Sequence, residues 1–362
     1  MGLGLAAYAF GPFPADRWCA YRSVMDTTGT LDEALQRLHA AGPERNGRLT
    51  NHAPMVVEAL AARGRAGQVH RWLDLYRRKL EEFPTATERV TAANWPEALG
   101  DPRRLADWIG YFERELADRP WREVLGQWWP RLLPGLYGGS THPVIRVGHA
   151  VRTLLGAQPT GPRLAELAHG LGYWAARYRP LAQLADGPGG FADADAALDA
   201  VSPIAERTGG FPERLARVTA LPAWPGVLAE PALARARLAE LVRAATHRYA
   251  THGHGEPTML VHAATAPNAV LRALPALPAR LWVPSLHAAW TASAAVTAMY
   301  APDGLSAGVA PLTSLGPEEV FDRALAHGDE HVIKLTDTAL DVGDPRALAA
   351  ALRSVELSEP LA

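Results

Sequence analysis

The sequence is poor in cysteine and in long hydrophobic runs. Its 362 residues include one cysteine, Cys19, which excludes a disulfide within the chain and a Cys-rich zinc site. No apolar run reaches the roughly 18–20 residues that a membrane-spanning helix needs, so we expect a cytoplasmic protein without a membrane partner. The 36 basic and 38 acidic residues give a net charge of −2, which lacks the basic surplus typical of nucleic-acid binding. With 48% hydrophobic residues, the chain has the composition of a globular protein.

Alternating strand patterns are also scarce, whereas apolar residues recur at helical spacing along most of the chain. One such face runs from Val69 to Phe83. Further helices are expected over residues 231–250, 258–274, 286–300, 317–327, 330–341 and 345–355. These patterns predict an all-α, multi-helical fold with roughly a dozen helices, and a single large domain over residues 1–362.

The segment 180–231 breaks this regularity. It is rich in proline and glycine, including Gly187-Pro188-Gly189-Gly190, and is too interrupted for long helices. Two interpretations are open: a connector between two helical lobes, or a lid over a site that they form.

Lysine is the other scarce residue. Of the 36 basic residues 34 are arginine, and the two lysines are Lys79 and Lys334. Lys79 lies in a charged run and needs no special explanation. Lys334 lies between apolar residues, three positions after His331, so both side chains share a helix face, with Asp337 and Thr338 one turn further on.

Two interpretations of this face are possible. It could be a polar stripe in which the lysine is paired with a carboxylate. It could also be a metal site, because burial favours the neutral amine, which captures carbon dioxide. The resulting carbamate is anionic and presents two oxygens, as a carboxylate does.

Other histidines occupy positions compatible with either a structural or a ligating role. His52 and His142 each lie at an apparent helix start that has an early proline, and a capping hydroxyl precedes His142. His149 follows His142 by seven residues on the same face, and His262 lies in a helical pattern among apolar neighbours. Taken singly, each fits a structural role better than a ligating one.

Four blocks, in this order, resemble the questin oxidase family: Asn51-His52, Gly138–Ile145, Leu260–His262 and His331–Lys334. The likeness spans roughly residues 30–345. It implies oxidative opening of a ring in an anthraquinone or related aromatic polyketide. Members have been described both as NADPH-linked Baeyer–Villiger-type oxygenases and as iron-dependent dioxygenases. The iron description implies Fe(II) held by His52, His142, His262, His331 and a carboxylated Lys334.

Further site residues follow from their neighbourhood in the sequence. We expect catalytic roles for His149 and Asp337, and substrate contacts from Trp128, Trp129, Tyr137 and Arg146. The tryptophans could form an aromatic wall for a polycyclic substrate or simply pack in the core. The one Gly-x-Gly-x-x-Ala string, Gly2–Ala7, has no preceding strand, so NADPH would act only as an external reductant.

The sequence thus predicts a metal-dependent oxygenase, with iron as the metal, that uses dioxygen to cleave or insert oxygen into a ring of an aromatic polyketide. Two alternatives are an NADPH-linked, metal-free Baeyer–Villiger-type monooxygenase and a non-catalytic helical ligand-binding protein. None of the three involves nucleic acid or a membrane.

Overall fold

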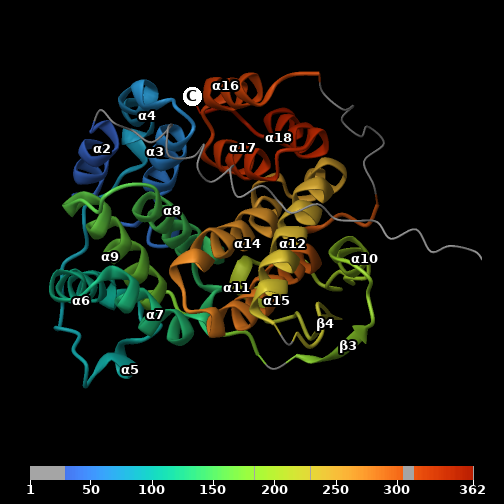
Figure 1. Ribbon diagram of the computed structural model, residues 1–362, viewed down its shortest axis with the longest axis horizontal. Coiled ribbons are helices and arrows are strands. Elements are labelled where there is room, and N and C mark those ends of the chain that lie inside the picture. The colour runs from blue at the N-terminus through green and yellow to red at the C-terminus, as the bar shows by residue number, and fades with distance from the viewer. Residues whose placement is uncertain (1–28, 183, 229, 305–313, 362) are drawn as a thin grey trace, which may run out of the picture.

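The computed structural model describes residues 29–182, 184–228, 230–304 and 314–361, and these are mainly helical (Figure 1). The expected all-α fold is confirmed. The helices are α2 (Thr30–Leu38), α3 (Ala53–Ala62), α4 (Val69–Tyr76), α5 (Trp95–Ala98), α6 (Leu105–Asp118), α7 (Trp121–Leu132), α8 (His142–Gly156), α9 (Gly161–Ala176), α10 (Ala194–Asp199), α11 (Phe211–Leu215), α12 (Pro231–His252), α13 (Pro257–Leu260), α14 (His262–Ala273), α15 (Trp282–Tyr300), α16 (Pro317–His327), α17 (Glu330–Val342) and α18 (Pro345–Leu357). Cys19 and Gly2–Ala7 lie outside the described residues.

Strands in the described residues form two small sheets. The strand β1 (Glu44–Arg45) pairs antiparallel with β2 (Leu49–Thr50), and β3 (Ala185–Gly189) pairs parallel with β4 (Ala220–Ala223). The broken segment 180–231 contains β3, α10, α11 and β4, with α10 packed on α12 and β4 on α15. In the described part of the chain, no helix is long and apolar enough to cross a membrane.

Two of the helix predictions need correction. The pattern from Val69 to Phe83 is helical only to Tyr76, with a 3-10 turn up to Lys79, and Leu80 is extended. Pro84 disfavours helical geometry at Phe83, so the helix cannot continue to the end of the predicted pattern. The expected helix 258–274 is divided into α13 and α14 at Val261.

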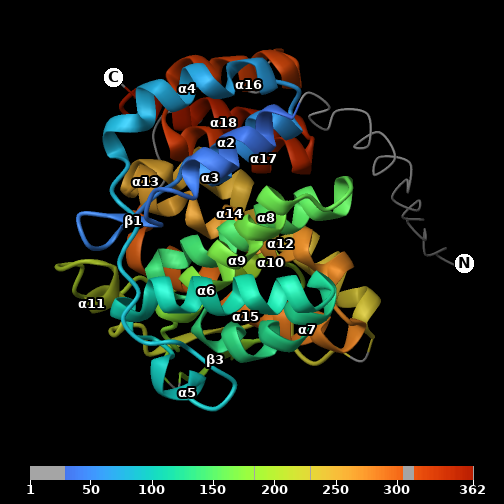
Figure 2. The same ribbon diagram turned by 90° about the vertical axis from the view of Figure 1, so that its left-hand side faces the viewer.

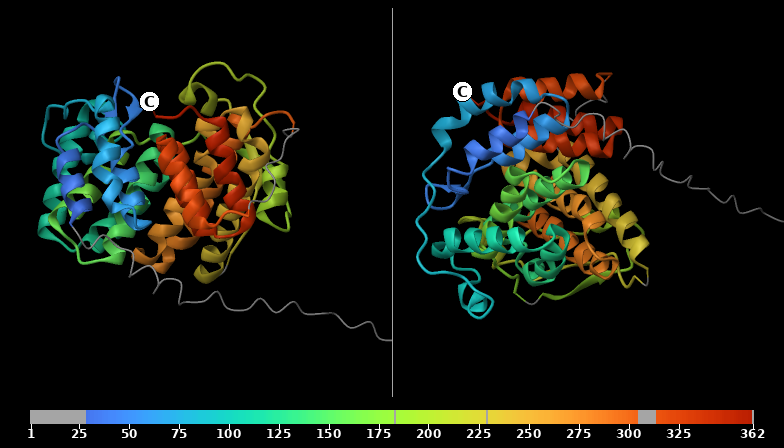
Figure 3. Two further views of the ribbon diagram at one scale, coloured as in Figure 1. Left: turned by 90° about the horizontal axis from the view of Figure 1, so that it is seen from above. Right: turned by 60° about the vertical axis from the view of Figure 1, so that its left-hand side comes forward.

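The N-terminal and C-terminal helices share one hydrophobic core, although nearly the whole chain separates them. Leu35 and Val57 pack in the same cluster as Phe321 and Ile333. In Figures 2 and 3 the blue helices α2–α4 accordingly lie against the red helices α16–α18. This packing brings the start of α3 next to the start of α17.

Four helices form a closed ring in which each packs on the next: α3 on α8, α8 on α14, α14 on α17, and α17 on α3. The contact between α8 and α14 is especially close at Gly148. A Cβ added there would lie 2.5 Å from the Ala269 Cβ and 2.8 Å from its carbonyl oxygen. Gly148 therefore sets how near α8 approaches α14.

We predict that Gly148→Ala lowers the free energy of unfolding by about 1–3 kcal/mol, because the added methyl group must push the two helices apart. Gly110→Ala in α6 is the matched control, since its Cβ would meet only the end of the Arg114 side chain, at 3.4 Å. The control should gain up to about 1 kcal/mol from better helix propensity. Urea unfolding followed by circular dichroism measures both, and equal effects of the two substitutions would contradict the close contact.

Candidate metal centre

Four histidines lie at the starts of the four helices of the ring. His52 directly precedes α3, His142 and His262 are the first residues of α8 and α14, and His331 is the second residue of α17. Pro54 and Pro143 occupy the first turns of α3 and α8, where proline fits because those amides need no partner in the helix. The start of α17 is capped by the Asp329 carboxylate, which accepts hydrogen bonds from the backbone N–H groups of His331 and Val332.

The four imidazole rings are in contact. The His142 ring centroid is 4.6 Å from that of His52 and 4.3 Å from that of His262, and the His52 and His331 centroids are 4.5 Å apart. One ring nitrogen from each of His52, His142 and His331 lies within 4.8 Å of the other two. All four residues are buried, with 0–8% of their surface exposed: His52 5%, His142 8%, His262 0% and His331 8%.

Hydrogen bonds determine which nitrogens of His52 and His142 carry hydrogen. His142 Nδ1 donates to the Gly139 carbonyl at 2.8 Å, and His52 Nδ1 donates to the Glu330 carboxylate at 3.1 Å. In the neutral rings both Nε2 atoms therefore present lone pairs, and they face each other at 2.8 Å. Two lone pairs at this distance repel unless a cation lies beside both. Nitrogens that bind one ion at right angles, each about 2.1 Å from it, stand about 3 Å apart, so the pair fits a metal.

Two further polar atoms of the cluster are buried without a hydrogen-bond partner: His262 Nε2 and Lys334 Nζ. Lys334 is 1% exposed. His262 Nδ1 is 3.1 Å from the Thr141 hydroxyl, which was expected to cap α8 but makes no capping hydrogen bond. A buried polar atom without a partner is costly, and a bound ion would satisfy it.

The backbone that precedes His142 is strained. Gly139, Ser140 and Thr141 have φ angles of 54°, 53° and 66°, in the left-handed region that residues with a Cβ rarely adopt. Such strain is typical of functional sites, where the surrounding structure holds it. Here it directs the Gly139 carbonyl to His142 and the Thr141 hydroxyl to His262.

Burial keeps the histidines in the neutral form that metals bind. Desolvation, followed by the charge of Lys334, lowers the pKa of His52 to about 4. Desolvation also holds the pKa values of His142, His262 and His331 well below the usual value. Burial lowers the pKa of Lys334 to about 8, which favours the neutral amine.

Two charged residues that were not predicted from the sequence lie beside the histidines. Glu330, 3% exposed, accepts from His52 Nδ1 and from Lys79 Nζ, the latter at 3.0 Å. Both lysines of the chain therefore lie at this cluster. The scarcity of lysine was a usable signal for Lys79 as well as for Lys334, but the charged run around Lys79 concealed it.

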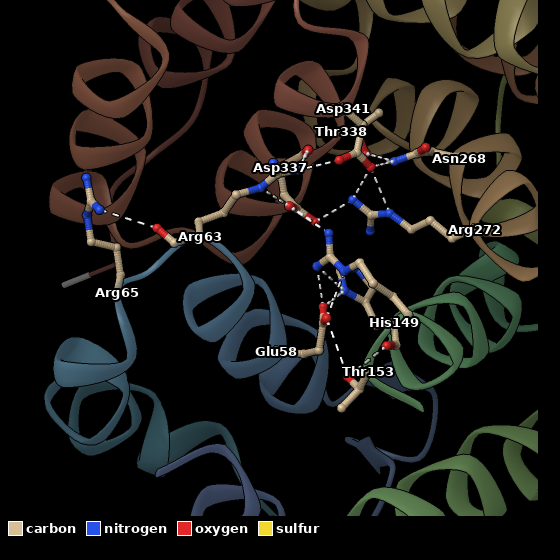
Figure 4. Close-up of polar contacts among 11 residues, drawn as sticks. Glu58, Arg63, Arg65, His149, Thr153, Asn268, Arg272, Asp337, Thr338 and Asp341 are labelled. Carbon is tan, nitrogen blue, oxygen red and sulfur yellow. Dashed lines mark hydrogen bonds and ion pairs between the residues drawn. The ribbon is translucent and has the colours of Figure 1, made fainter. Parts of the chain in front are cut away.

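His149 and Asp337, for which catalytic roles were expected, lie in a separate buried ionic layer further along the four helices (Figure 4). His149 Nδ1 is 2.6 Å from the Glu58 carboxylate, and Asp337 accepts hydrogen bonds from arginines. The side chains of His149 and Asp337 therefore bind partners in the ionic layer and do not contact the four imidazoles.

Trp128 and Trp129, for which substrate contacts were expected, are fully buried in the main hydrophobic core. The Trp128 ring contacts those of Trp95, Trp108, Tyr111 and Phe112 at centroid distances of 5.0–5.5 Å, with Trp95 at 5.2 Å and Phe112 at 5.0 Å. Trp129 packs on Trp174 and donates to the Ser285 hydroxyl. Both tryptophans therefore occupy packing positions.

A cavity of about 440 Å³ lies between α15 and the segment 184–228. Its walls are mostly apolar and include Trp224 and Trp290, whose centroids are 5.3 Å apart, with His287 and Thr291 as polar groups. Tyr137, for which a substrate contact was expected, is buried in the main hydrophobic core just before the strained loop. The Pro/Gly-rich segment thus covers a hollow beside α15.

Arg146, the fourth expected substrate residue, is 2% exposed and pairs with Glu166. Its guanidinium donates two hydrogen bonds to the carboxylate, at 2.6 and 2.8 Å. Glu166 also accepts from His39 at 3.0 Å, which links α8 and α9 to the end of α2. The structure thus gives Arg146 a buried ion pair.

Comparison with known proteins supports one family. Residues 49–185 match the family model described as Questin oxidase-like, which confirms the resemblance over that segment. The match includes His52 and His142, whereas His262, His331 and Lys334 lie beyond it. A search of curated proteins gave no match.

We predict that Glu166→Gln destabilises the protein by about 3–5 kcal/mol at pH 7, because it leaves the buried Arg146 charge without a carboxylate. Burial raises the pKa of Glu166, but Arg146 and His39 lower it to about 2, against 4.5 in the unfolded chain. The stabilisation is therefore complete above about pH 4.5 and is lost as the pH falls towards 2. Urea unfolding of both proteins between pH 7 and 2 tests this, and a difference that does not shrink in acid would contradict it.

Proposed function

Starting from the questin oxidase-like sequence of residues 49–185, we propose that this protein is an iron-dependent oxygenase acting on a polycyclic aromatic polyketide such as an anthraquinone. The family match indicates an oxidoreductase. The observation that supports iron dependence is the convergence of four buried, neutral histidines and one buried amine at the starts of four helices.

The donor set suits iron. His52, His142, His262 and His331 would hold the ion through imidazole nitrogens, and Lys334 would add an anionic oxygen as its carbamate. Imidazole and carboxylate-type ligands are the set that non-heme Fe(II) oxygenases use. When bound, iron would supply the redox chemistry with dioxygen, while the protein orients the reactants and excludes water.

Lys334 is suited to form the carbamate. Its neutral Nζ attacks the carbon of carbon dioxide; an N–C bond forms, one C=O electron pair moves to oxygen, and one proton leaves to water. The amine has no hydrogen-bond partner that competes for its lone pair. The starts of four helices carry partial positive charge, which stabilises an anionic group at this position.

Neighbouring groups hold the ligands in their binding tautomers. Glu330 fixes hydrogen on His52 Nδ1, and the Gly139 carbonyl fixes hydrogen on His142 Nδ1, so both Nε2 atoms remain free to bind. Lys79 pairs with Glu330 and balances its charge. Carboxylate and carbonyl partners of this kind orient metal-binding histidines in many proteins.

We predict about one iron ion per chain in protein purified without chelators, measured by elemental mass spectrometry, because the donors form one cluster. Chelation should then stop oxygen consumption in the presence of an anthraquinone. NADPH-dependent turnover that survives complete metal removal would favour the metal-free monooxygenase. Tight binding of the aromatic compound with neither metal nor turnover would favour the binding protein.

We predict that Lys334→Met and His331→Ala both lose iron and activity together. The loss of affinity should exceed the about 10–100-fold that removal of an outer partner costs, because each substitution removes a ligand. Lys334→Arg should fail as well, since a guanidinium keeps its charge and cannot form the carbamate. His254→Ala, an exposed histidine, is the control and should keep its iron.

The carbamate can be observed directly. Protein equilibrated with ¹³C-bicarbonate should show a carbamate ¹³C resonance that is absent from Lys334→Met. In Lys334→Gly, added acetate should restore part of the iron binding by supplying the missing oxygen ligand. Full iron binding by Lys334→Met without acetate would rule out a role for this lysine as a ligand.

A further inference from the structure

The buried ionic layer joins the same four helices that carry the histidines. Glu58 follows His52 by six residues on α3, Arg152 follows His142 by ten on α8, and Arg272 follows His262 by ten on α14. On α17, Asp337 follows His331 by six residues, which places it about 9 Å along the helix. The four helices therefore run in the same direction, from the histidine cluster to the ionic layer, and Figure 4 shows the side chains of that layer.

One carboxylate at the centre of this layer contacts all three other helices. Asp337, whose side chain is fully buried, accepts from Arg63 Nε at 2.7 Å, Arg152 Nη1 at 3.0 Å and Arg272 Nη2 at 2.7 Å. Arg63 is the C-cap residue of α3, Arg152 belongs to α8, and Arg272 belongs to α14. Asp341, one turn further along α17, accepts from Arg63 and Arg272 as well.

Opposite charges alternate in the layer. Three arginines face the carboxylates of Glu58, Asp337 and Asp341, and Glu58 pairs with Arg152. Burial raises the pKa of Asp337, but Arg152, Arg272 and Arg63 lower it well below the usual range, so the carboxylate is ionised. Removing the charge of Asp337 would leave Arg63, Arg152 and Arg272 facing one carboxylate fewer, and the arginines would repel one another more strongly.

We propose that Asp337 is a positioning residue that clamps α3, α8, α14 and α17 and so holds the four histidines at the spacing needed to share one metal ion. This inference rests on the proposed function for its metal, but the clamp itself is a property of the folded chain. Asp337 does not touch the reacting atoms. It acts through the arginines on the angle and register of the helices whose starts carry the ligands.

The test compares Asp337→Asn with Asp107→Asn. Asp107 is a matched control because its side chain is also buried, at 2% exposed, and it pairs with an arginine, Arg104, at 2.7 Å. It binds the loop at Thr87 to α6, and α6 carries no histidine of the cluster. Both substitutions remove one buried charge of the same chemistry, so both should lower the free energy of unfolding.

The first readout is the dissociation constant of Co²⁺, followed by its visible absorption in the metal-free protein. Asp337→Asn should bind Co²⁺ about 10–100-fold more weakly, as when an outer partner of a metal ligand is lost. Asp107→Asn should bind like the unchanged protein. Unchanged affinity in Asp337→Asn, or equal weakening in both variants, would overturn the proposal.

The second readout needs no metal. The backbone N–H of His52 donates to the Tyr76 hydroxyl and that of His331 donates to Asp329, so hydrogen exchange reports on both helix starts. Exchange at these amides should be at least about tenfold faster in Asp337→Asn than in Asp107→Asn at equal global stability. If the unchanged protein binds neither Co²⁺ nor iron, the proposed function fails and this comparison alone decides on the clamp.

A second variant covers the case in which Asp337→Asn does not fold. Arg272→Lys keeps the positive charge, but its single ammonium cannot bridge Asp337 and Asp341 as the guanidinium does. It should reproduce the weaker Co²⁺ binding and the faster exchange at His52 and His331. Behaviour identical to the unchanged protein would overturn the clamp.

Discussion

The arrangement of this molecule depends on two imidazole lone pairs that face each other across 2.8 Å in a buried site. Each lone pair is on Nε2, because Nδ1 of the same ring carries the hydrogen and donates it. His52 Nδ1 donates to the Glu330 carboxylate, and His142 Nδ1 donates to the Gly139 carbonyl. The protein therefore holds donors together that repel in the absence of a cation. The strained backbone before His142 serves this arrangement, because it places the Gly139 carbonyl against His142 Nδ1.

The electrostatic field of the four helix starts also favours neutral side chains in the site. Four helix starts converge on the histidines, and their partial positive charges disfavour imidazolium and an ammonium at Lys334. Neutral imidazoles bind metal, and a neutral amine can become an anionic ligand. Glu330 and the Asp329 cap add negative charge at the start of α17, which offsets part of the field and attracts a cation. The site thus favours a cation surrounded by neutral and anionic donors.

Local patterns in the sequence were enough to predict the helical fold, the helix starts at His52 and His142, and the unusual setting of Lys334. They were not enough to predict contacts between distant segments. Nothing near Lys79 indicates its partner Glu330, 251 residues away, because only the folded chain brings the 3-10 turn that follows α4 to the start of α17. The spacing from His331 to Asp337 placed both on one helix, but the three arginines around Asp337 come from other helices. For the same reason, the tryptophans near His142 could not be assigned to core or cavity from the sequence.

The use of the two kinds of basic residue follows from their chemistry. In the ionic layer Arg63 and Arg272 each reach both Asp337 and Asp341, which requires a planar, permanently charged group with several donors. At the histidine cluster the chain has its two lysines instead. A guanidinium at position 334 would stay charged among the imidazoles and would repel a metal ion, whereas an ammonium can lose its proton when buried. The fixed charges therefore lie where the helices are joined, and the basic group that can become neutral lies where a cation would bind.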